Sequence, residues 1–244
     1  MMRRVVIAAL SATLWVSSPS FAYEEPVRQF TNPVVQERAE AQFVAYDPFE
    51  SMNRSLYKFN AVFDRYVFLP VIDTYRFIVP EYVDDRITSF FANIGEFRNT
   101  TNALLQGKPD RVFSSVGRFV LNSTVGILGL YDPAAAIGLK PHTEDFGQTL
   151  AVWGVGAGPY LVLPLLGPTN ARDSFGLAVD TVALSVVTPH RVKDSLGYKI
   201  AYYGVQPINI RAQNDFRYYA SGSPFEYDLV RYVTTETRRI LIMD

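Results

Sequence analysis

Apolar side chains recur at helical spacing near the start of the folded part of the chain. The helix they predict opens with a capping box, with Asp47 as N-cap, Pro48 in the first turn and Glu50 three residues after the cap. Pro70 is expected to end or kink this helix. The apolar positions are three or four residues apart and form one stripe along the helix: Phe49, Met52, Leu56, Phe59, Phe63 and Val67.

Helical patterns continue along most of the remaining sequence. Two further helices are predicted from about Tyr82 to Gly107 and from about Asp110 to Leu121, and helical periodicity returns at 170–184 and 208–220. The segment Ser223-Pro-Phe-Glu226 repeats the cap, proline and glutamate of the first helix and predicts a last helix. No useful length of chain alternates hydrophobic and polar positions, so β-strands are expected to be minor or absent. The predicted fold class is all-α.

Charge is distributed unevenly along these helices. Residues 119–171 carry four charged side chains in 53 positions, against 18 in 72 for residues 47–118 and 17 in 73 for residues 172–244. Within the middle segment, residues 146–171 form a run of 26 without a charge, long enough to cross a membrane as a helix. Five glycines and three prolines interrupt this run, however, so a continuous helix is not expected.

Two interpretations of residues 146–171 stay open. The segment is either the buried core of a soluble domain or a re-entrant apolar segment that lines a channel, where protein or water satisfies the irregular backbone. In both cases, Gly158-Pro159 and Gly167-Pro168 are predicted to be turns that fold the segment back on itself.

The N-terminus is typical of a secretory signal peptide. Within residues 1–22, two arginines precede an apolar run (5–16), and Ser20-Phe21-Ala22 is a small-x-small cleavage site. A short transmembrane anchor is the alternative, but the run falls short of the roughly 20 residues that a spanning helix needs. Residues 23–46 are polar and predict an extended arm, followed by one domain over 47–244. The mature chain is therefore expected outside the cytoplasm.

The composition argues against several classes of protein. The 244 residues are 48% hydrophobic and carry a net charge of −1, which disfavours nucleic acid as a partner. Cysteine is absent, which excludes disulfides, thiolate metal sites, thiol nucleophiles and a lipid on an N-terminal cysteine. His142 and His190 are the two histidines, and no nucleophile-elbow, Walker A or dinucleotide-binding motif occurs. No enzymatic activity, cofactor or metal is expected, and His142 beside Glu144 and Asp145 is interpreted as a solvated polar loop.

Six linked motifs, in order and at consistent spacing, resemble the MlaA (VacJ) family. The resemblance covers roughly Asp47 to Asp180 and weakens beyond, where Ser223-Pro-Phe stands at a family Asp-Pro-Tyr. The motifs are Asp47-Pro-Phe-Glu-Ser-Met-Asn-Arg54 with Phe59-Asn60, Leu105-Gln-Gly107, Arg118-Phe119 with Asn122-Ser-Thr124, Asp145-Phe-Gly-Gln-Thr-Leu150, Gly158-Pro-Tyr-Leu-Val-Leu-Pro164 running to Gly167-Pro168, and Arg172-Asp173.

The resemblance implies an outer-membrane component of a phospholipid transport system. Such proteins are ring-like bundles of amphipathic helices, embedded in the periplasmic leaflet beside trimeric porins, with a central channel. Phospholipids misplaced in the outer leaflet pass through the channel to a soluble periplasmic lipid carrier, and this maintains lipid asymmetry. Most members are lipoproteins; this chain lacks the cysteine, so it is expected on the periplasmic side of the outer membrane without a lipid anchor. The alternative is a periplasmic or outer-membrane-associated scaffold protein with no lipid channel.

The candidate functional residues follow from these motifs. Asn53 and Asn60 are seven residues apart and share a helix face, so their amides either line a channel or bond nearby backbone. Arg172 and Asp173 either pair with each other or lie beside a headgroup phosphate. The candidates for the lipid pathway are Asn53, Asn60, Asn99, Asn102, Phe146, Trp153, Tyr160, Leu161, Leu163, Arg172 and Asp173. The positions expected to be structural are Asp47, Pro48, Glu50, Gly147, Gly158, Pro159, Pro164, Gly167 and Pro168.

Overall fold

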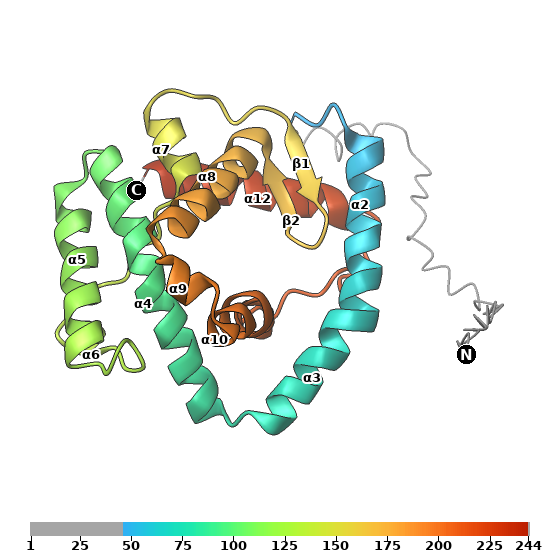
Figure 1. Cartoon of the computed structure of the whole chain (residues 1–244). Helices are drawn as coiled ribbons and strands as arrows, with labels where there is room; N and C mark the ends of the chain where they lie inside the picture. Colours follow the sequence, from blue (N-terminus) through green and yellow to red (C-terminus); the bar gives the residue numbers. More distant parts are fainter. Residues whose placement is uncertain (1–45, 244) are drawn as a thin grey trace, which may run out of the picture.

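The computed structural model describes residues 46–243, which form a ring of helices (Figure 1). The predicted signal peptide and the predicted arm up to residue 45 lie outside the described residues. One side of the ring is a bent rod made of α2 (Glu50–Phe63), a π-helical stretch η1 (Asp64–Phe68) and α3 (Leu69–Ile78). The other side is α4 (Glu81–Leu105), which meets α3 in a V at the bottom of Figure 1.

Three further helices and a hairpin complete the ring wall. Helix α5 (Pro109–Thr124) packs along the outer side of α4 and leads to the short α6 (Pro133–Ala136). Helix α7 (Phe146–Val152) and the strands β1 (Tyr160–Leu163) and β2 (Gly167–Asn170) then close the ring opposite the V (Figure 1). These elements confirm a mainly helical fold with minor β-structure.

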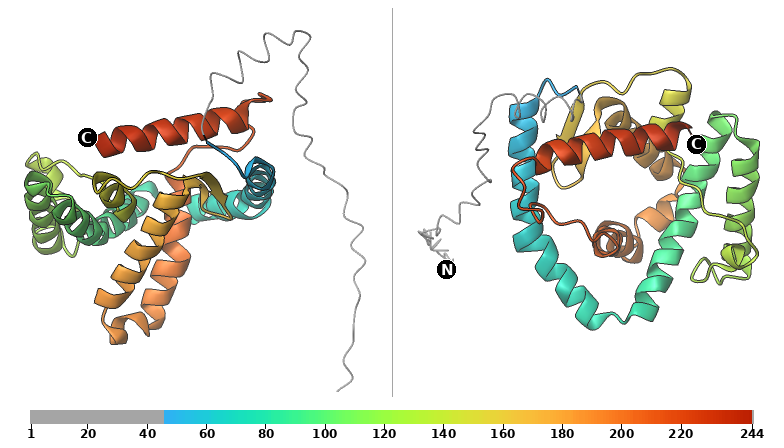
Figure 2. Two further views of the ribbon diagram at one scale, coloured as in Figure 1. Left: turned by 90° about the horizontal axis from the view of Figure 1, so that it is seen from above. Right: turned by 180° about the vertical axis from the view of Figure 1, so that it is seen from behind.

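A helical hairpin and the last helix lie on opposite faces of this ring (Figure 2). Helix α8 (Ala171–Val187) leaves the ring and projects from one face, and the chain returns alongside it. Helix α12 (Glu226–Met243) crosses the opposite face. The returning elements are α9 (His190–Lys193), α10 (Leu196–Lys199), the π-helical η2 (Ile200–Val205) and α11 (Gln206–Ala212).

Pro70 bends the first rod without ending it. A proline lacks the N–H that bonds to the carbonyl four residues earlier, and its ring collides with that carbonyl. Here the preceding turn is widened into η1, so the helix continues through Pro70 and changes direction between α2 and α3 (Figure 1).

The predicted capping box at Asp47 is wrong. Helix α2 begins at Glu50 with Phe49 as its N-cap, and no side chain caps it. The Asp47 carboxylate instead accepts hydrogen bonds from Asn53 Nδ2 at 2.7 Å and from the Tyr227 hydroxyl at 2.5 Å. A buried side chain of α2 itself, Asn53, and one of the distant helix α12, Tyr227, therefore bind this carboxylate in place of the local backbone.

The predicted capping box before the last helix is also wrong. Helix α12 begins at Glu226, whose carboxylate accepts from the Tyr57 hydroxyl at 3.0 Å and from the backbone N–H of Ser221 at 3.2 Å. The capping box that does form is at α7, where Asp145 accepts from the Gln148 N–H and the Gln148 side chain accepts from the Asp145 N–H.

Two more predictions need correction. Gly167-Pro168 is not a turn: it begins β2, with Gly167 opposite Leu163 across a three-residue turn. A proline is tolerated there because β2 belongs to a two-stranded sheet. The helix predicted over 208–220 ends at Ala212, because the Asn214 side chain accepts from the Phe216 N–H and stabilises a turn.

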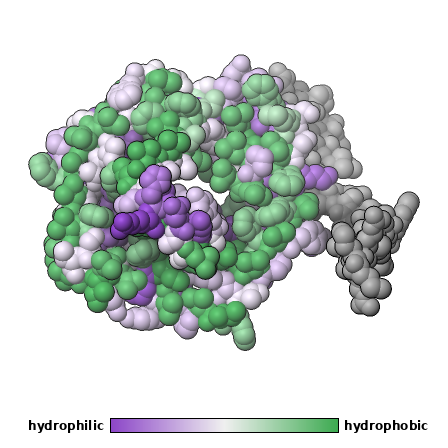
Figure 3. Space-filling view, viewed as in Figure 1, coloured by the Kyte–Doolittle hydropathy of each residue, from purple (hydrophilic) through white to green (hydrophobic). Residues whose placement is uncertain are grey.

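The ring buries polar side chains and exposes hydrophobic ones. Among the described residues, nine hydrophobic and eighteen polar or charged side chains are buried, whereas 46 large hydrophobic side chains are exposed. On α2, Phe59 of the apolar stripe is exposed and the buried face carries Asn53, Asn60 and Asp64. Hydrophobic residues cover much of the ring rim in Figure 3. The molecule is therefore amphipathic in the reverse sense from a water-soluble protein.

The charge-poor run over 146–171 does not form a hydrophobic core. Of its apolar side chains, Tyr160 and Val162 are buried, whereas Trp153, Leu165 and others are exposed. Among residues 46–243, no helix combines the length and the apolar composition needed to cross a bilayer.

Candidate functional site

The candidate site is the ring together with the places where its wall is joined. In Figure 1, the opening is bordered by α2 and α3, by α4, by the β-hairpin and by the projecting helices. In the space-filling view of this face, polar residues gather over the tip of the projecting helices, and hydrophobic residues lie around them (Figure 3). The shape of this opening depends on the hydrogen bonds and ion pairs that hold the surrounding elements together.

Two asparagines of α2 hold the β-hairpin against the ring. The Asn53 side chain donates to the Tyr160 carbonyl at 3.0 Å and accepts from the Val162 N–H at 2.9 Å. One heptad later, Asn60 donates to the Leu163 carbonyl at 2.9 Å and accepts from the N–H of residue 165 at 2.7 Å. Each amide thus pairs with β1 as a peptide group of a neighbouring strand would.

The spacing of these asparagines matches the strand. Seven residues of α-helix rise about 10.5 Å, and three residues of strand span about 10 Å. Asn53 and Asn60 therefore meet equivalent backbone groups three residues apart on β1 and the turn that follows it. Together with the Tyr46 carbonyl, which accepts from the Tyr160 N–H, they cover the edge of β1 that faces away from β2. In this contact, both amides bond backbone, as one of the two sequence-based readings expected.

A small aromatic core lies where α2, β1 and α12 meet. Tyr57, Tyr160, Val162 and Tyr227 are buried together, and Tyr57 packs edge-to-face on Tyr227 with ring centroids 5.7 Å apart. Burial, and then the negative charge of the hydrogen-bonded Glu226, raises the pKa of Tyr57 far above its ordinary value. Tyr57 therefore stays a neutral hydrogen-bond donor to Glu226.

Charged pairs surround this aromatic core. Arg54 bonds Asp228 at 3.1 Å and places its guanidinium 4.2 Å from the centre of the Tyr227 ring. Arg231 approaches Asp47 at 3.2 Å. We call this contact region of residues 47–57, 160–162 and 226–231 the seam, because it joins the first and last helices of the described chain.

A second polar group ties α4 to α7 and α8. Asn102 donates to Asp180 at 3.0 Å, and its carbonyl oxygen accepts from the Thr149 hydroxyl at 2.8 Å. Asp180 also accepts from the Phe146 N–H at 2.9 Å. Asn99 is buried nearby and accepts from the backbone N–H of residue 144 at 3.2 Å. The four candidate asparagines are thus all buried and all join separate elements.

Arginine and aspartate side chains alternate where α7, α8 and α12 meet. Arg172 lies 2.9 Å from Asp173, and Arg238 of α12 bonds both Asp173 and Asp145 at 2.7 Å. Burial alone would raise the pKa of Asp145, but the hydrogen bonds and charge of Arg238 outweigh burial and lower it. Arg172 and Asp173 therefore pair with each other inside a larger ionic group.

Helices α7 and α8 cross at two glycines. A side chain on Gly176 would place its Cβ 2.3 Å from the backbone nitrogen of Gly147, and a side chain on Gly147 would collide with the Asp173 carboxylate at 2.5 Å. The two backbones approach this closely because neither residue carries a Cβ. The structural role predicted for Gly147 is consistent with this close approach.

The apolar candidates lie at the surface around these polar joints. Trp153 ends α7, packs edge-to-face on Phe146 at 6.0 Å and donates its Nε1–H to the Leu105 carbonyl at 3.1 Å. Leu161 and Leu163 are half-buried on β1. These side chains give the hairpin and α7 a largely apolar outer surface.

The candidate residues thus fall into two groups in space. Asn53, Asn60, Tyr160 and the leucines of β1 lie at or beside the seam, and Asn99, Asn102, Phe146, Arg172 and Asp173 lie around α7 and α8. Sequence reasoning missed Asp180 and Arg238, which connect the second group. No local spacing relates these two residues to their partners, which are 34 to 93 positions away.

No metal site is found in the described part of the chain, where no three acidic or histidine side chains come together to hold an ion. Glu144, beside His142, is fully buried and forms ion pairs with Arg111 and Lys108. Two basic side chains therefore neutralise the charge of this carboxylate through its Oε1 atom.

Comparison with known proteins gives consistent matches. A family model described as MlaA lipoprotein matches residues 45–240, which extends well beyond the segment recognised from motifs. A Rickettsia bellii protein of unknown function is 41% identical over 167 residues, covering 68% of this chain and 64% of that protein. The Haemophilus influenzae intermembrane phospholipid transport system lipoprotein MlaA is 33% identical over 171 residues, covering 69% of this chain and 67% of that protein.

A solved structure has the same fold. It is described as the structural basis for maintenance of bacterial outer membrane lipid asymmetry, and it superposes with a TM-score of 0.64 at 30% identity, covering 81% of this chain and all of that one. The matched region spans 60 to 65% of the length of the Rickettsia relatives.

Proposed function

The chain belongs to the MlaA family, and on that premise we propose that it transports phospholipids between membranes. In this proposal, it removes phospholipids from the outer leaflet of the outer membrane and passes them to a periplasmic carrier, which maintains lipid asymmetry. The names of its relatives and the description of the matching structure support the general process. The protein moves lipid by passive guidance and performs no chemical step.

The inverted burial is the observation that carries this proposal. If the described residues formed a water-soluble scaffold, the hydration of 46 exposed large hydrophobic side chains would be unfavourable in free energy. These side chains include Phe77 at 90% and Val186 at 77% exposure. In a bilayer the same side chains are solvated by acyl chains, and the polar side chains are satisfied inside the ring. The burial therefore favours a membrane-embedded ring over the scaffold alternative.

A shielded route is what a phospholipid needs. At about 0.8 kcal/mol per CH₂, exposing roughly 30 methylenes to water costs on the order of 20 kcal/mol. We propose that Phe146, Trp153, Leu161 and Leu163 offer the tails an apolar surface. In this proposal the asparagines hold the wall together, because their amides are buried against other elements.

The proposal includes two protein partners, a trimeric porin and a soluble periplasmic lipid carrier. The resemblance to the family and the apolar helix faces that are exposed in the described part of the chain support them. The exposed apolar side chains of α5 are Phe113, Val116, Phe119 and Val120, and those of α12 are Leu229, Tyr232, Val233, Ile240 and Met243.

Complementation tests the function as a whole. In a strain that lacks its own MlaA-like protein, expression of this chain is expected to lower outer-leaflet phospholipid, measured by acylation of exposed lipid, and to restore resistance to detergent. The chain is expected to remain with outer membranes after a high-salt wash. Recovery in the soluble periplasm, with no change in outer-leaflet lipid, would contradict the proposal.

A negative charge on the hairpin is expected to block the lipid route. In Leu163→Asp, a carboxylate replaces a half-buried apolar side chain on β1, so tails passing the hairpin would meet a charge that is costly to desolvate. Outer-leaflet phospholipid should stay near the level of the deletion strain while the protein is still found in the membrane. Ser51→Asp adds the same charge at an exposed position of α2 and should complement normally. If a folded Leu163→Asp protein still clears outer-leaflet phospholipid normally, the hairpin does not line the lipid pathway.

A further inference from the structure

The guanidinium of Arg98, in the ring wall, has no hydrogen-bonding partner within residues 46–243. Arg98 lies on α4, its Nε is buried without a hydrogen bond, and its guanidinium takes part in no ion pair among the described residues. Comparable guanidinium groups are engaged: Arg118 by Glu96 at 2.6 Å and Arg211 by Asp64 at 2.7 Å. Partial burial of a guanidinium without a direct partner costs desolvation free energy, which an anionic ligand would offset.

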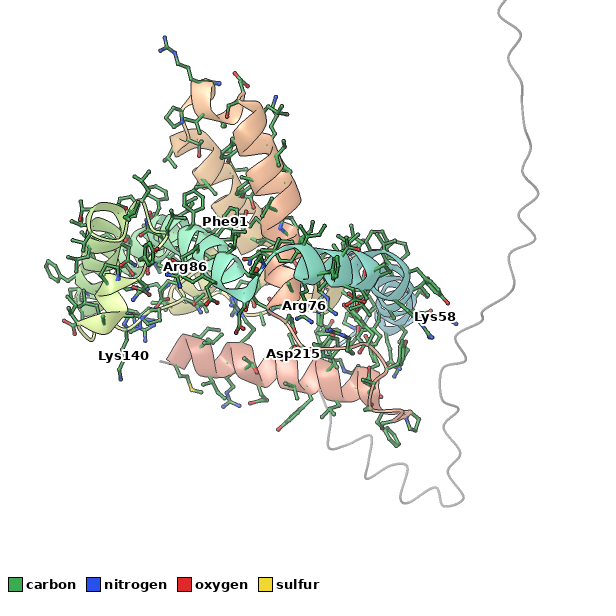
Figure 4. All side chains as sticks on the ribbon, turned by 90° about the horizontal axis from the view of Figure 1, so that it is seen from below. Lys58, Arg76, Arg86, Phe91, Lys140 and Asp215 are labelled. Carbon is green, nitrogen blue, oxygen red and sulfur yellow. The ribbon has the colours of Figure 1, made fainter. Side chains whose placement is uncertain are left out.

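Arg98 is on the side of α4 that faces the projecting helices. It follows Phe91 by seven residues and so continues the same face of the helix. Figure 4 shows Phe91 on the side of α4 where these helices project. Asn102, one turn further along the same face of α4, donates to Asp180 of α8 at 3.0 Å, so this face lies against α8. The charge of Arg98 also acts electrostatically on Asp180 and on Tyr202 of η2.

The nearby carboxylates are already engaged elsewhere. Asp145, on which Arg98 also acts, is held by two nitrogens of Arg238 at 2.7 and 2.9 Å. Asp180 accepts from the Phe146 N–H at 2.9 Å. Arg98 therefore feels negative charge at a distance while its own donors stay available for an oxygen ligand.

An aromatic cluster on α10 and η2 includes Tyr202, on which the charge of Arg98 acts. Tyr198 and Tyr202 are stacked with ring centroids 5.3 Å apart, and Tyr203 packs edge-on against both. Tyr203 is 70% exposed, so the cluster offers an open apolar surface with hydroxyl groups at its edge. Amphipathic aromatic rings of this kind are suited to the region between a lipid headgroup and its tails.

We propose that Arg98 binds the phosphate of a phospholipid headgroup at the ring opening, with Tyr198, Tyr202 and Tyr203 against the glycerol and first acyl carbons. This inference rests on the proposed function and adds a specific binding site to it. A guanidinium binds phosphate through two parallel hydrogen bonds, which a lysine ammonium does not reproduce.

Binding of a short-chain lipid tests the site. The purified full chain in dodecyl maltoside is titrated with dihexanoylphosphatidylethanolamine and followed by ³¹P NMR. Arg98→Gln is expected to weaken binding about tenfold, as loss of a charge-assisted pair predicts, and Arg98→Lys about threefold. Thermal unfolding should be nearly unchanged, because the Arg98 guanidinium bonds no described residue, and its backbone carbonyl, which accepts from Asn102, is unaffected by the substitution.

Arg86→Gln is the matched control. Arg86 is on the same helix and its Nε also lacks a partner, but its guanidinium is covered by the rings of Tyr82 and Tyr131 at 5.1 and 4.6 Å. Its substitution should change lipid affinity less than twofold. An equal loss in both variants would overturn the proposal, because the effect would then follow net charge and not the site.

Competition and complementation separate the remaining outcomes. Inorganic phosphate should displace the lipid only at concentrations about a hundredfold higher; displacement at equal concentration would make free phosphate the ligand and overturn the lipid assignment. If Arg98→Gln binds lipid as the unmodified chain does, Arg98 is not the site, although complementation by the unmodified chain would still support transport. If the unmodified chain neither binds lipid nor complements, the proposed function itself fails.

Discussion

Asn53→Ala is expected to lower the free energy of unfolding by about 3 to 4 kcal/mol. The substitution removes hydrogen bonds to Asp47, to the Tyr160 carbonyl and to the Val162 N–H. It also leaves two backbone groups of β1 unpaired, and each unsatisfied buried group costs about 1 to 3 kcal/mol. Urea denaturation of the purified protein, followed by circular dichroism, measures the change.

Lys58→Ala provides the control on the same helix. Lys58 is exposed on α2 and is labelled in Figure 4, and its loss should change the free energy of unfolding by no more than about 0.5 kcal/mol. Asn60→Ala should resemble Asn53→Ala, because it leaves the Leu163 carbonyl and the residue 165 N–H unpaired. An Asn53→Ala protein as stable as the Lys58→Ala protein would show that the amide does not hold the hairpin.

Gly176→Ala is expected to destabilise the ring by about 2 to 3 kcal/mol. Its Cβ would lie 2.3 Å from the backbone nitrogen and 2.7 Å from the Cα of Gly147, so α7 and α8 must move apart. That movement also disturbs the Phe146 N–H bond to Asp180 and the pairing of Asp173 with Arg238. The melting temperature should fall, and outer-leaflet phospholipid in complemented cells should rise with it.

Gly95→Ala makes the same substitution in an open helical position. Apart from the neighbouring backbone of α4 itself, no described heavy atom lies within 4 Å of a Cβ at Gly95, so the change should stabilise the helix by about 0.5 to 1 kcal/mol. If Gly95→Ala raises the free energy of unfolding and Gly176→Ala lowers it, the loss at Gly176 comes from the close approach of two backbones and not from helix propensity. A stabilising effect at Gly176 would mean that α7 and α8 are not packed as described.

Helix positions could be read from the sequence because periodicity is local. The predicted helix from Tyr82 to Gly107 is α4, Glu81–Leu105, and the helix predicted from Asp110 lies within α5. The direction of each apolar face could not be read in the same way. A stripe such as that of Phe59 predicts an amphipathic helix, but the pattern is the same whether the stripe faces a core or a membrane.

The contacts of the site could not be predicted for a different reason. Asp47 and Glu226 stand where capping residues stand, so a local rule assigns them to helix starts. Their partners Tyr227 and Tyr57 are 180 and 169 residues away, and no pattern along the chain marks such a pair. The motifs identified the residues that matter for the ring, but the tertiary structure determines what each carboxylate binds.

The seam has a consequence for how the ring assembles. Its contacts join positions more than 100 residues apart, so the entropy of closing these long loops must be overcome before any of the contacts contributes. Helix α12 supplies its share of the seam through residues 226–231, so the wall stays an open arc until that segment packs against α2 and β1. The ring is therefore expected to close late in folding, after the helices of its wall have formed.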